Sequence, residues 1–281
     1  MSPRIGLALG GGAARGFGHI PMLEVLDEMG LQVHRIAGTS MGALVGAAYA
    51  AGMGGLEIRA HALEVLGTRM QAARRVFSGG GAFDLLQFKG FGPALINGEA
   101  LTRLMLPESV PDELEQLRIA FSVSAADFYL GQEVVLAAGS LRQAVAASIA
   151  IPGVIAGPRI DGRLLVDGGI INPLPVDHLR RDCDLTIAVD VTGKPTPNPD
   201  GREPSNTELV VGAVQIFTRQ LVSLRNGLNP PDVYVEPPVS QFRAHEFFKL
   251  REILEAGDKE RDAFKRALEM KLGQVERSCQ L

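Results

Sequence analysis

Ser40 lies in the pentapeptide Gly38-Thr39-Ser40-Met41-Gly42, and its hydroxyl is the side chain best placed for nucleophilic chemistry. An apolar run precedes the pentapeptide and an uncharged, Ala-rich segment follows it, which predicts a strand, a tight turn and a helix. Such a turn has little room for side chains at Gly38 and Gly42. It raises the hydroxyl at the N-terminus of the helix, where the helix dipole favours developing negative charge. Glycine and serine are common in turns, so the pentapeptide alone does not define a site.

A second candidate element is the glycine-rich segment Gly10-Gly11-Gly12-Ala13-Ala14-Arg15-Gly16. It follows an apolar run at 4–9, which predicts the first strand, and it precedes a predicted helix over 17–29. The carboxyl ends of neighbouring parallel strands face one crevice, so we expect this loop beside Ser40. Small residues let backbone N–H groups approach a substrate oxygen. Gly10, Gly11 and Gly12 are therefore candidates for an oxyanion hole.

A serine hydroxyl is barely ionised at neutral pH and needs a general base. None of the five histidines stands in a recognisable catalytic context: His19, His34, His61, His178 and His245. Asp167 ends a strand-like run and precedes Gly168-Gly169, so we expect it at the same carboxyl edge as Ser40. A buried carboxylate with a raised pKa could accept the serine proton directly. Asp127 and Asp190 also follow apolar runs and are competing carboxylates.

Along the chain, the glycine loop comes first, then the Ser40 pentapeptide, then Asp167-Gly168-Gly169. These three motifs in that order resemble the patatin-like phospholipases, and most closely their small bacterial members. The likeness extends from residue 4 to about residue 191, and it includes the segments 147–153 and 172–175. The resemblance implies a serine lipid acyl hydrolase with a Ser–Asp dyad, related in fold to cytosolic phospholipase A2. Ser148 lies in an Ala-rich stretch of the first of these segments and is interpreted as a packing residue.

The resemblance also implies roles for individual residues. Ser40 would be the nucleophile, Asp167 the general base, and the backbone of the three loop glycines, with Arg15 nearby, the oxyanion hole. The family's loop is often G-x-G-x-x-G, whereas Arg15 occupies the sixth position here, which leaves the register of the donors open by one residue. Arg15 is either a surface residue or one that positions the loop or meets an anionic head group. No calcium loop or zinc spacing is visible, so no metal or cofactor is expected.

The order of predicted elements indicates an α/β fold with a mainly parallel central sheet flanked by helices and with a helical cap. We expect a single domain over 1–281, with a core at about 5–191, the cap at about 53–110 and a C-terminal helical region at about 205–281. Within the cap, glycines and large apolar residues indicate a flap that is either a local cluster or a lipid contact: Phe83, Leu85, Leu86, Phe88 and Phe91.

Composition restricts the partners. The net charge of −4, the 5% of aromatic residues and the absence of Trp argue against a nucleic-acid partner. Cys183 and Cys279 fit no metal spacing, so a reducing compartment is expected. The segment 36–56 has no charged residue but is mostly Gly and Ala, so it is expected in a soluble core rather than in a bilayer. We expect a cytoplasmic protein, or one peripheral at the inner membrane face, that contacts a lipid or acyl-ester substrate. The sequence leaves the oligomeric state open.

Three other functions fit part of the sequence. An α/β-hydrolase would use a Ser–Asp–His triad with His178 or His245 as base, but the turn that carries the serine normally follows several strands in that fold, not the second strand. A dinucleotide site would need glycine in place of Arg15 and an acidic residue at the end of the second strand, which ends near Gly38. The third is a catalytically silent interaction protein on the patatin fold. The presence of all three motifs argues against it.

Overall fold

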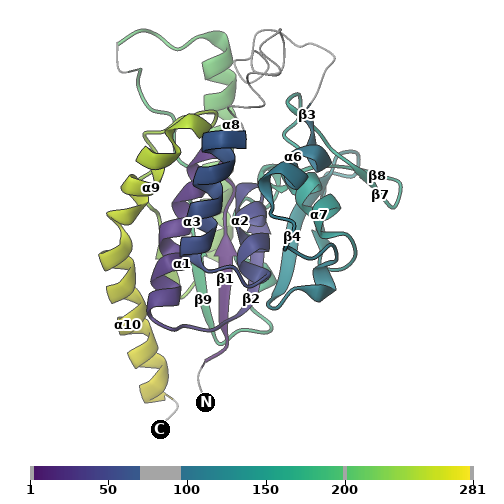
Figure 1. Cartoon of the computed structure of the whole chain (residues 1–281). Coiled ribbons are helices and arrows are strands. Elements are labelled where there is room, and N and C mark those ends of the chain that lie inside the picture. Colours follow the sequence, from purple (N-terminus) through teal and green to yellow (C-terminus); the bar gives the residue numbers. More distant parts are fainter. Residues whose placement is uncertain (1–2, 70–95, 199–200, 279–281) are drawn as a thin grey trace.

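The computed structural model describes residues 3–69, 96–198 and 201–278, and its fold is α/β with a mainly parallel central sheet (Figure 1). The strands of this sheet are, in spatial order, β10 (Val233–Val235), β9 (Leu185–Val189), β1 (Ile5–Leu9), β2 (Val33–Thr39), β4 (Ala120–Asp127), β8 (Arg163–Asp167) and β7 (Arg159–Ile160), with β5 (Gln132–Leu136) also paired to β4. The strands from β10 to β4 are parallel, whereas β5 and β8 run antiparallel to β4. The predicted fold class is confirmed.

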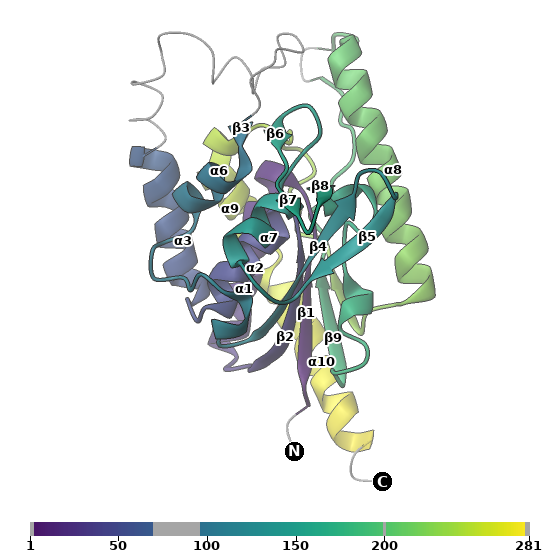
Figure 2. The same ribbon diagram turned by 90° about the vertical axis from the view of Figure 1, so that its right-hand side faces the viewer.

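Helices cover both faces of the sheet (Figure 2). One face carries α1 (His19–Glu28), α2 (Met41–Ala50), α3 (Gly55–Glu64), α7 (Leu141–Ser148), α9 (Leu250–Asp258) and α10 (Arg261–Ser278), and α6 (Gly98–Met105) packs on α7. The opposite face carries α8 (Asn206–Leu228). Short helices and a two-stranded sheet complete the described residues: η1 (Ala13–Gly18), η2 (Val65–Arg69), η3 (Leu114–Gln116), η4 (Gly168–Ile170), η5 (Val176–His178), η6 (Phe247–Lys249), β3 (Ile96–Asn97) and β6 (Ile155–Ala156).

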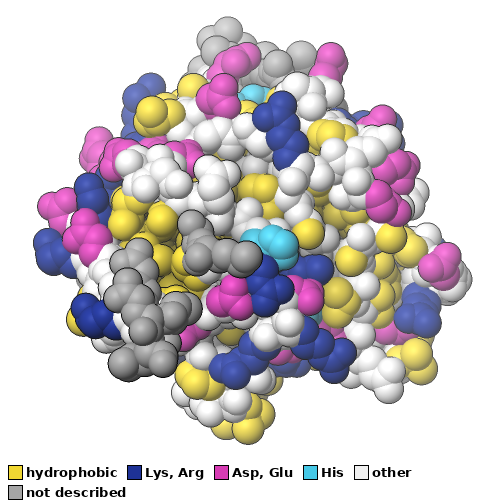
Figure 3. All heavy atoms as spheres, turned by 90° about the horizontal axis from the view of Figure 1, so that it is seen from below, with side chains coloured by type: hydrophobic (Ala, Val, Ile, Leu, Met, Phe, Trp, Pro, Cys, Tyr) yellow, Lys and Arg dark blue, Asp and Glu magenta, His cyan; other side chains and the backbone are white. Residues whose placement is uncertain are grey.

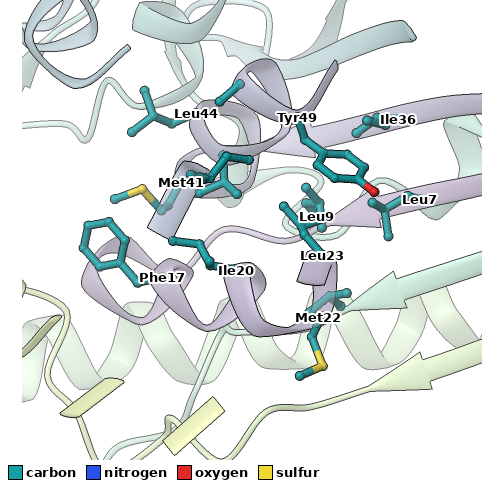
Figure 4. Packing of buried hydrophobic residues seen from close by; sticks show 14 of the residues in the cluster. Leu7, Leu9, Phe17, Ile20, Met22, Leu23, Ile36, Met41, Leu44 and Tyr49 are labelled. Atoms are coloured by element: carbon teal, nitrogen blue, oxygen red, sulfur yellow. The ribbon is translucent and has the colours of Figure 1, made fainter. Parts of the chain in front are cut away.

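The core lies mainly between the sheet and the layer of α1 and α2. Side chains alternate across β1, because successive residues of a strand point to opposite faces. Leu7 and Leu9 join Ile20 and Leu23 of α1 in the main cluster (Figure 4). The other face of the sheet is lined by small side chains, Ala8, Ala37 and Ala188, which pack with Leu174, Val176, Leu179 and Val222. Most of the buried apolar residues therefore lie on the face that carries the helix after Ser40.

The structure tests the expectation about a bilayer-spanning segment but not those about the flap and the domain boundaries. No helix within the described ranges is long and apolar enough to cross a bilayer. The predicted flap residues between 83 and 91 lie outside the described residues, and the domain boundaries stay predictions. On the face drawn in Figure 3, acidic and basic side chains are interspersed.

Candidate active site

The turn that carries Ser40 is as tight as the sequence predicts. Strand β2 ends at Thr39 and α2 begins at Met41, so Ser40 alone forms the turn. Its backbone has φ 54° and ψ −122°, a conformation that costs a non-glycine residue about 1–3 kcal/mol. A Cβ atom on Gly42 would lie 2.1 Å from the carbonyl oxygen of Leu9. Packing of the turn against β1 thus holds the serine in a strained conformation.

Ser40 and Asp167 are in direct contact. The hydroxyl of Ser40 donates a hydrogen bond of 2.7 Å to Oδ2 of Asp167, and the backbone N–H of Gly169 donates one of 2.7 Å to Oδ1. Both side chains are buried, at 6% and 7% exposure. Burial raises the pKa of Asp167 to about 6, although the hydrogen bonds from Ser40 and Gly169 lower it. The carboxylate is therefore ionised at neutral pH and more basic than an ordinary aspartate.

Asp167 reaches the site on a strand that runs against the parallel strands of the sheet. Strand β8 is antiparallel to β4 and pairs Asp167 with Ala125. The strand is the second arm of a hairpin with β7, whose turn, Asp161 and Gly162, has φ values of 50° and 76°. Such left-handed values suit a two-residue hairpin turn. Strand β8 therefore starts beyond the carboxyl ends of the parallel strands and ends at that edge with Asp167, in contact with Ser40.

The glycine loop lies against Ser40, but not every N–H group is free. A Cβ atom on Gly11 would lie 3.3 Å from Cβ of Ser40. Gly10 donates to the carbonyl of Val189 at 3.1 Å and Gly11 to that of Pro173 at 2.9 Å. These bonds occupy the N–H groups of two of the three predicted oxyanion donors, and the oxyanion role of Gly10 and Gly11 stays a prediction.

Gly12 is the loop glycine that remains as a candidate donor. Within the described residues, its N–H group has no hydrogen-bond acceptor. A Cβ atom on Gly12 would lie 2.5 Å from the carbonyl oxygen of Val191, so only glycine fits this position without a shift of the backbone.

Arg15 is buried rather than at the surface, at 3% exposure. Its Nε donates to the carbonyl of Val191 at 3.2 Å and its Nη1 to that of Phe242 at 3.3 Å. Burial lowers the pKa of Arg15 to about 10, so the side chain stays charged at neutral pH. The interpretation as a surface residue is wrong. These contacts connect the glycine loop to two later segments, which supports a positioning role for Arg15 rather than a direct contact with the oxyanion.

Ser148 has a contact that sequence reasoning missed. Its hydroxyl accepts a hydrogen bond of 2.7 Å from the backbone N–H of Ser40 and donates one of 2.6 Å to the carbonyl of Ser124. The interpretation as a packing residue is therefore incomplete. Ser148 links α7 and β4 to the strained turn. The available signal was its place in the segment 147–153, which carries part of the family resemblance.

We expect Ser148→Ala to destabilise the protein and to lower kcat. It leaves the buried N–H of Ser40 without an acceptor, which costs about 1–3 kcal/mol. Urea unfolding and steady-state kinetics measure the two effects, and Ser223→Ala, at an exposed serine of α8, is the matched control. Unchanged stability and kcat would show that the contact has no role in holding the turn.

His178, His19, Asp127 and Asp190 have hydrogen-bond partners other than Ser40 and Asp167. Nε2 of His178 lies 2.9 Å from a carboxylate oxygen of Glu133, and the hydrogen bonds to Asp167 within the described residues come from Ser40 and Gly169, not from a histidine. The ring of His19 is hydrogen-bonded to the carbonyl of Gly10. Asp127 accepts hydrogen bonds from the N–H groups of Tyr129 and Leu130, and Asp190 accepts them from Thr192 and Tyr234. The geometry thus favours a dyad over a triad.

A polar cluster beneath the turn includes Glu133, Asp177 and His178, whose ligand atoms lie within 4.8 Å of one another. A metal ion is one way to use such a group. Here the guanidinium of Arg225 lies 3.3 Å from Asp177 and 3.7 Å from Glu133 and offsets part of the acidic charge. Asn172 donates to both carboxylates and accepts from Thr39 through its backbone oxygen. We interpret the cluster as structural support for the turn.

Comparison with known proteins identifies the family of this chain. The fold and the turn at Ser40 define an α/β protein with a serine between a strand and a helix. The model of the family described as patatin-like phospholipase matches residues 7–180, and the chain belongs to that family. The predicted resemblance is confirmed.

Individual relatives are longer. An NTE family protein of Mycobacterium tuberculosis is 39% identical over 207 residues, which cover 73% of this chain and 54% of that protein. Lysophospholipase NTE1 of Saccharomyces cerevisiae is 25% identical over 284 residues, 90% of this chain and 16% of that protein. VipD from Legionella pneumophila has a TM-score of 0.49 at 14% identity and covers 95% of this chain and 67% of its own. The chain spans about half the length of the mycobacterial relative and a much smaller share of the yeast one.

Proposed function

We propose that this chain hydrolyses carboxylic esters of lipids, with Ser40 as nucleophile and Asp167 as general base. The observation that carries the proposal is the hydrogen bond of 2.7 Å between the Ser40 hydroxyl and the Asp167 carboxylate. Membership of the patatin-like phospholipase family supports the lipid ester as substrate class, as does a relative named a lysophospholipase. A lipid substrate implies transient contact with a membrane surface.

In the first half of the proposed reaction, Oδ2 of Asp167 takes the proton of Ser40 while Oγ attacks the acyl carbonyl. The tetrahedral intermediate collapses, and the leaving alcohol receives the proton from Asp167. In the second half, Asp167 takes a proton from water, whose oxygen attacks the acyl-enzyme. The acid leaves, and Ser40 regains its proton. A base with a pKa of about 6 suits both transfers at neutral pH better than an ordinary carboxylate does.

The oxyanion would be stabilised by backbone N–H groups. Gly12 is one proposed donor, because its N–H has no acceptor within the described residues. Met41 begins α2, so its N–H is one of the groups that a helix leaves unpaired at its N-terminus. The dipole of α2 adds to the stabilisation of negative charge at this place. Loss of one such donor typically costs about 3–4 kcal/mol of transition-state stabilisation.

A fluorophosphonate probe tests the proposal, because it reacts covalently with activated serines. We expect it to label the peptide that contains Ser40 and to abolish hydrolysis of a p-nitrophenyl ester in proportion. The same preparation is then assayed on a lysophospholipid, a diacyl phospholipid and a neutral lipid. Protein denatured before exposure to the probe is the control.

Each result has a distinct meaning. A folded protein that is neither labelled nor active would contradict the proposal and favour a catalytically silent interaction protein. Labelling and turnover of the p-nitrophenyl ester without turnover of any lipid would contradict the substrate class alone.

A further inference from the structure

The charged side chains of helix α8 form ion pairs with residues of the body of the molecule. Gly212 and Val222 of the helix are buried against that body. The pairs are Glu208 with Arg243 at 3.1 Å, Arg219 with Glu236 at 2.8 Å and Arg225 with Asp177 at 3.3 Å. A surface helix of a globular protein ordinarily has the opposite arrangement, with its charged residues toward water.

The outer side of α8 is mostly apolar, with Gln220 and Ser223 as its exposed polar residues, and it carries no charged residue. Between 209 and 228, every exposed residue of the helix is uncharged. The large apolar side chains among them are between 50% and 80% exposed: Leu209, Val210, Val214, Ile216, Phe217, Leu224 and Leu228. Figure 2 shows α8 as the outermost element on its side of the sheet. A group of exposed large apolar side chains on one helix marks an interaction site in soluble proteins.

The spacing of these residues identifies the kind of partner. Val210, Val214, Phe217, Leu221, Leu224 and Leu228, here called the seam, follow one another at intervals of four, three, four, three and four residues. This is the heptad spacing at which two helices pack side by side. The order of intervals is the same in both directions. Two antiparallel copies of α8 would therefore place Phe217 opposite Leu221 and Val210 opposite Leu228.

We propose that the seam of α8 is the interface of a homodimer in which each copy covers the seam of the other. A two-fold interface brings the same surface patch against itself and must be self-complementary. An uncharged seam meets this condition, since no like charges face each other and no inward ion pair has to break. The seam is about 27 Å long and the helix about 10–12 Å wide, so the seam alone covers roughly 300 Å² on each copy. A stable interface buries about 800 Å² per copy, so the surface beside the seam must contribute the rest. Leu209 and Ile216 extend this apolar centre.

A lipid surface fits the same helix less well. Helices that lie in a membrane interface are rich in Lys and Arg on the polar face, where they contact anionic head groups. The two arginines of α8, Arg219 and Arg225, are instead bound to Glu236 and Asp177 of the same chain.

Sedimentation velocity of the full chain at micromolar concentration tests the proposal. We expect a mass twice the 29.9 kDa of one chain. Phe217→Glu and Leu224→Glu should each give a monomer, because each places unpaired charges inside the seam. Both side chains are exposed in the single chain, so circular dichroism and the melting temperature should stay near those of the wild type. Leu56→Glu is the matched control, at a leucine of α3 that is 72% exposed, and should remain dimeric.

Three outcomes would overturn the proposal. The first is a wild-type protein that sediments as a monomer, and the second is a dimer that survives both seam variants. The third is a monomer that floats with phosphatidylcholine vesicles and loses this binding in Leu224→Glu, which would assign the seam to a lipid surface. None of these measurements depends on catalytic activity.

Discussion

Ser40→Ala is expected to lower kcat for ester hydrolysis by about 10⁴-fold or more, the order of loss found when an activated nucleophile is removed. The fold should be preserved, because alanine keeps the backbone geometry of the turn and removes only the hydroxyl. Ser40→Ala should also change the pKa of Asp167. The Ser40 hydrogen bond lowers the pKa of Asp167, so its removal should raise that pKa above about 6.

The comparison with Ser223→Ala separates the loss of the nucleophile from a general effect of removing a serine hydroxyl. Turnover of a p-nitrophenyl ester measures the activity, and the carboxyl signal of Asp167 in an isotope-edited pH titration measures the pKa. Activity of Ser40→Ala close to that of the wild type would exclude Ser40 as the nucleophile.

Asp167→Asn is expected to abolish most of the activity while it stabilises the protein at neutral pH. The amide can still bond Ser40 and Gly169 but cannot take a proton. Burial raises the pKa of Asp167 from 3.8 to about 6, which corresponds to about 3 kcal/mol of preference for the neutral form. Between these pH values the folded state binds more protons than the unfolded state. Wild-type stability therefore falls as the pH rises through this window, and the asparagine variant lacks that decline.

Two measurements check this prediction. Thermal melts of both proteins at pH 4 and pH 8 should show the variant gaining stability relative to the wild type at the higher pH. The wild-type profile of kcat/KM should fall on the acid side with a midpoint near pH 6, because protonation removes the base. Full activity in Asp167→Asn would contradict the dyad, and His178→Gln would then test the histidine bound to Glu133.

The sequence predicts the parts of this molecule that rest on local patterns. Alternation of apolar runs with glycine-rich turns gives the parallel strands β1 and β2, their helices and the turn at Ser40. The direction of β8 could not be predicted, since a five-residue strand with three apolar residues forms equally well in either direction. The hydrogen bond from Ser40 to Ser148 joins residues 108 positions apart, and no local pattern encodes it.

The glycine loop shows the same limit. Whether a loop N–H is free depends on distant carbonyls, here those of Val189 and Pro173, which occupy the amides of Gly10 and Gly11. The outward apolar side of α8 is a further case. The apolar spacing predicts a helix over 209–224, but it does not say which side of that helix meets the sheet.

The hairpin of β7 and β8 has a consequence for how the proposed site comes together and comes apart. Ser40 follows β2, a central strand that is paired on both sides, whereas Asp167 belongs to a locally closed hairpin that pairs with β4 over only three residues. Units with fewer strand pairings open at lower free energy than the centre of a sheet. We therefore expect mild denaturant to separate the proposed nucleophile and its proposed base before the sheet unfolds.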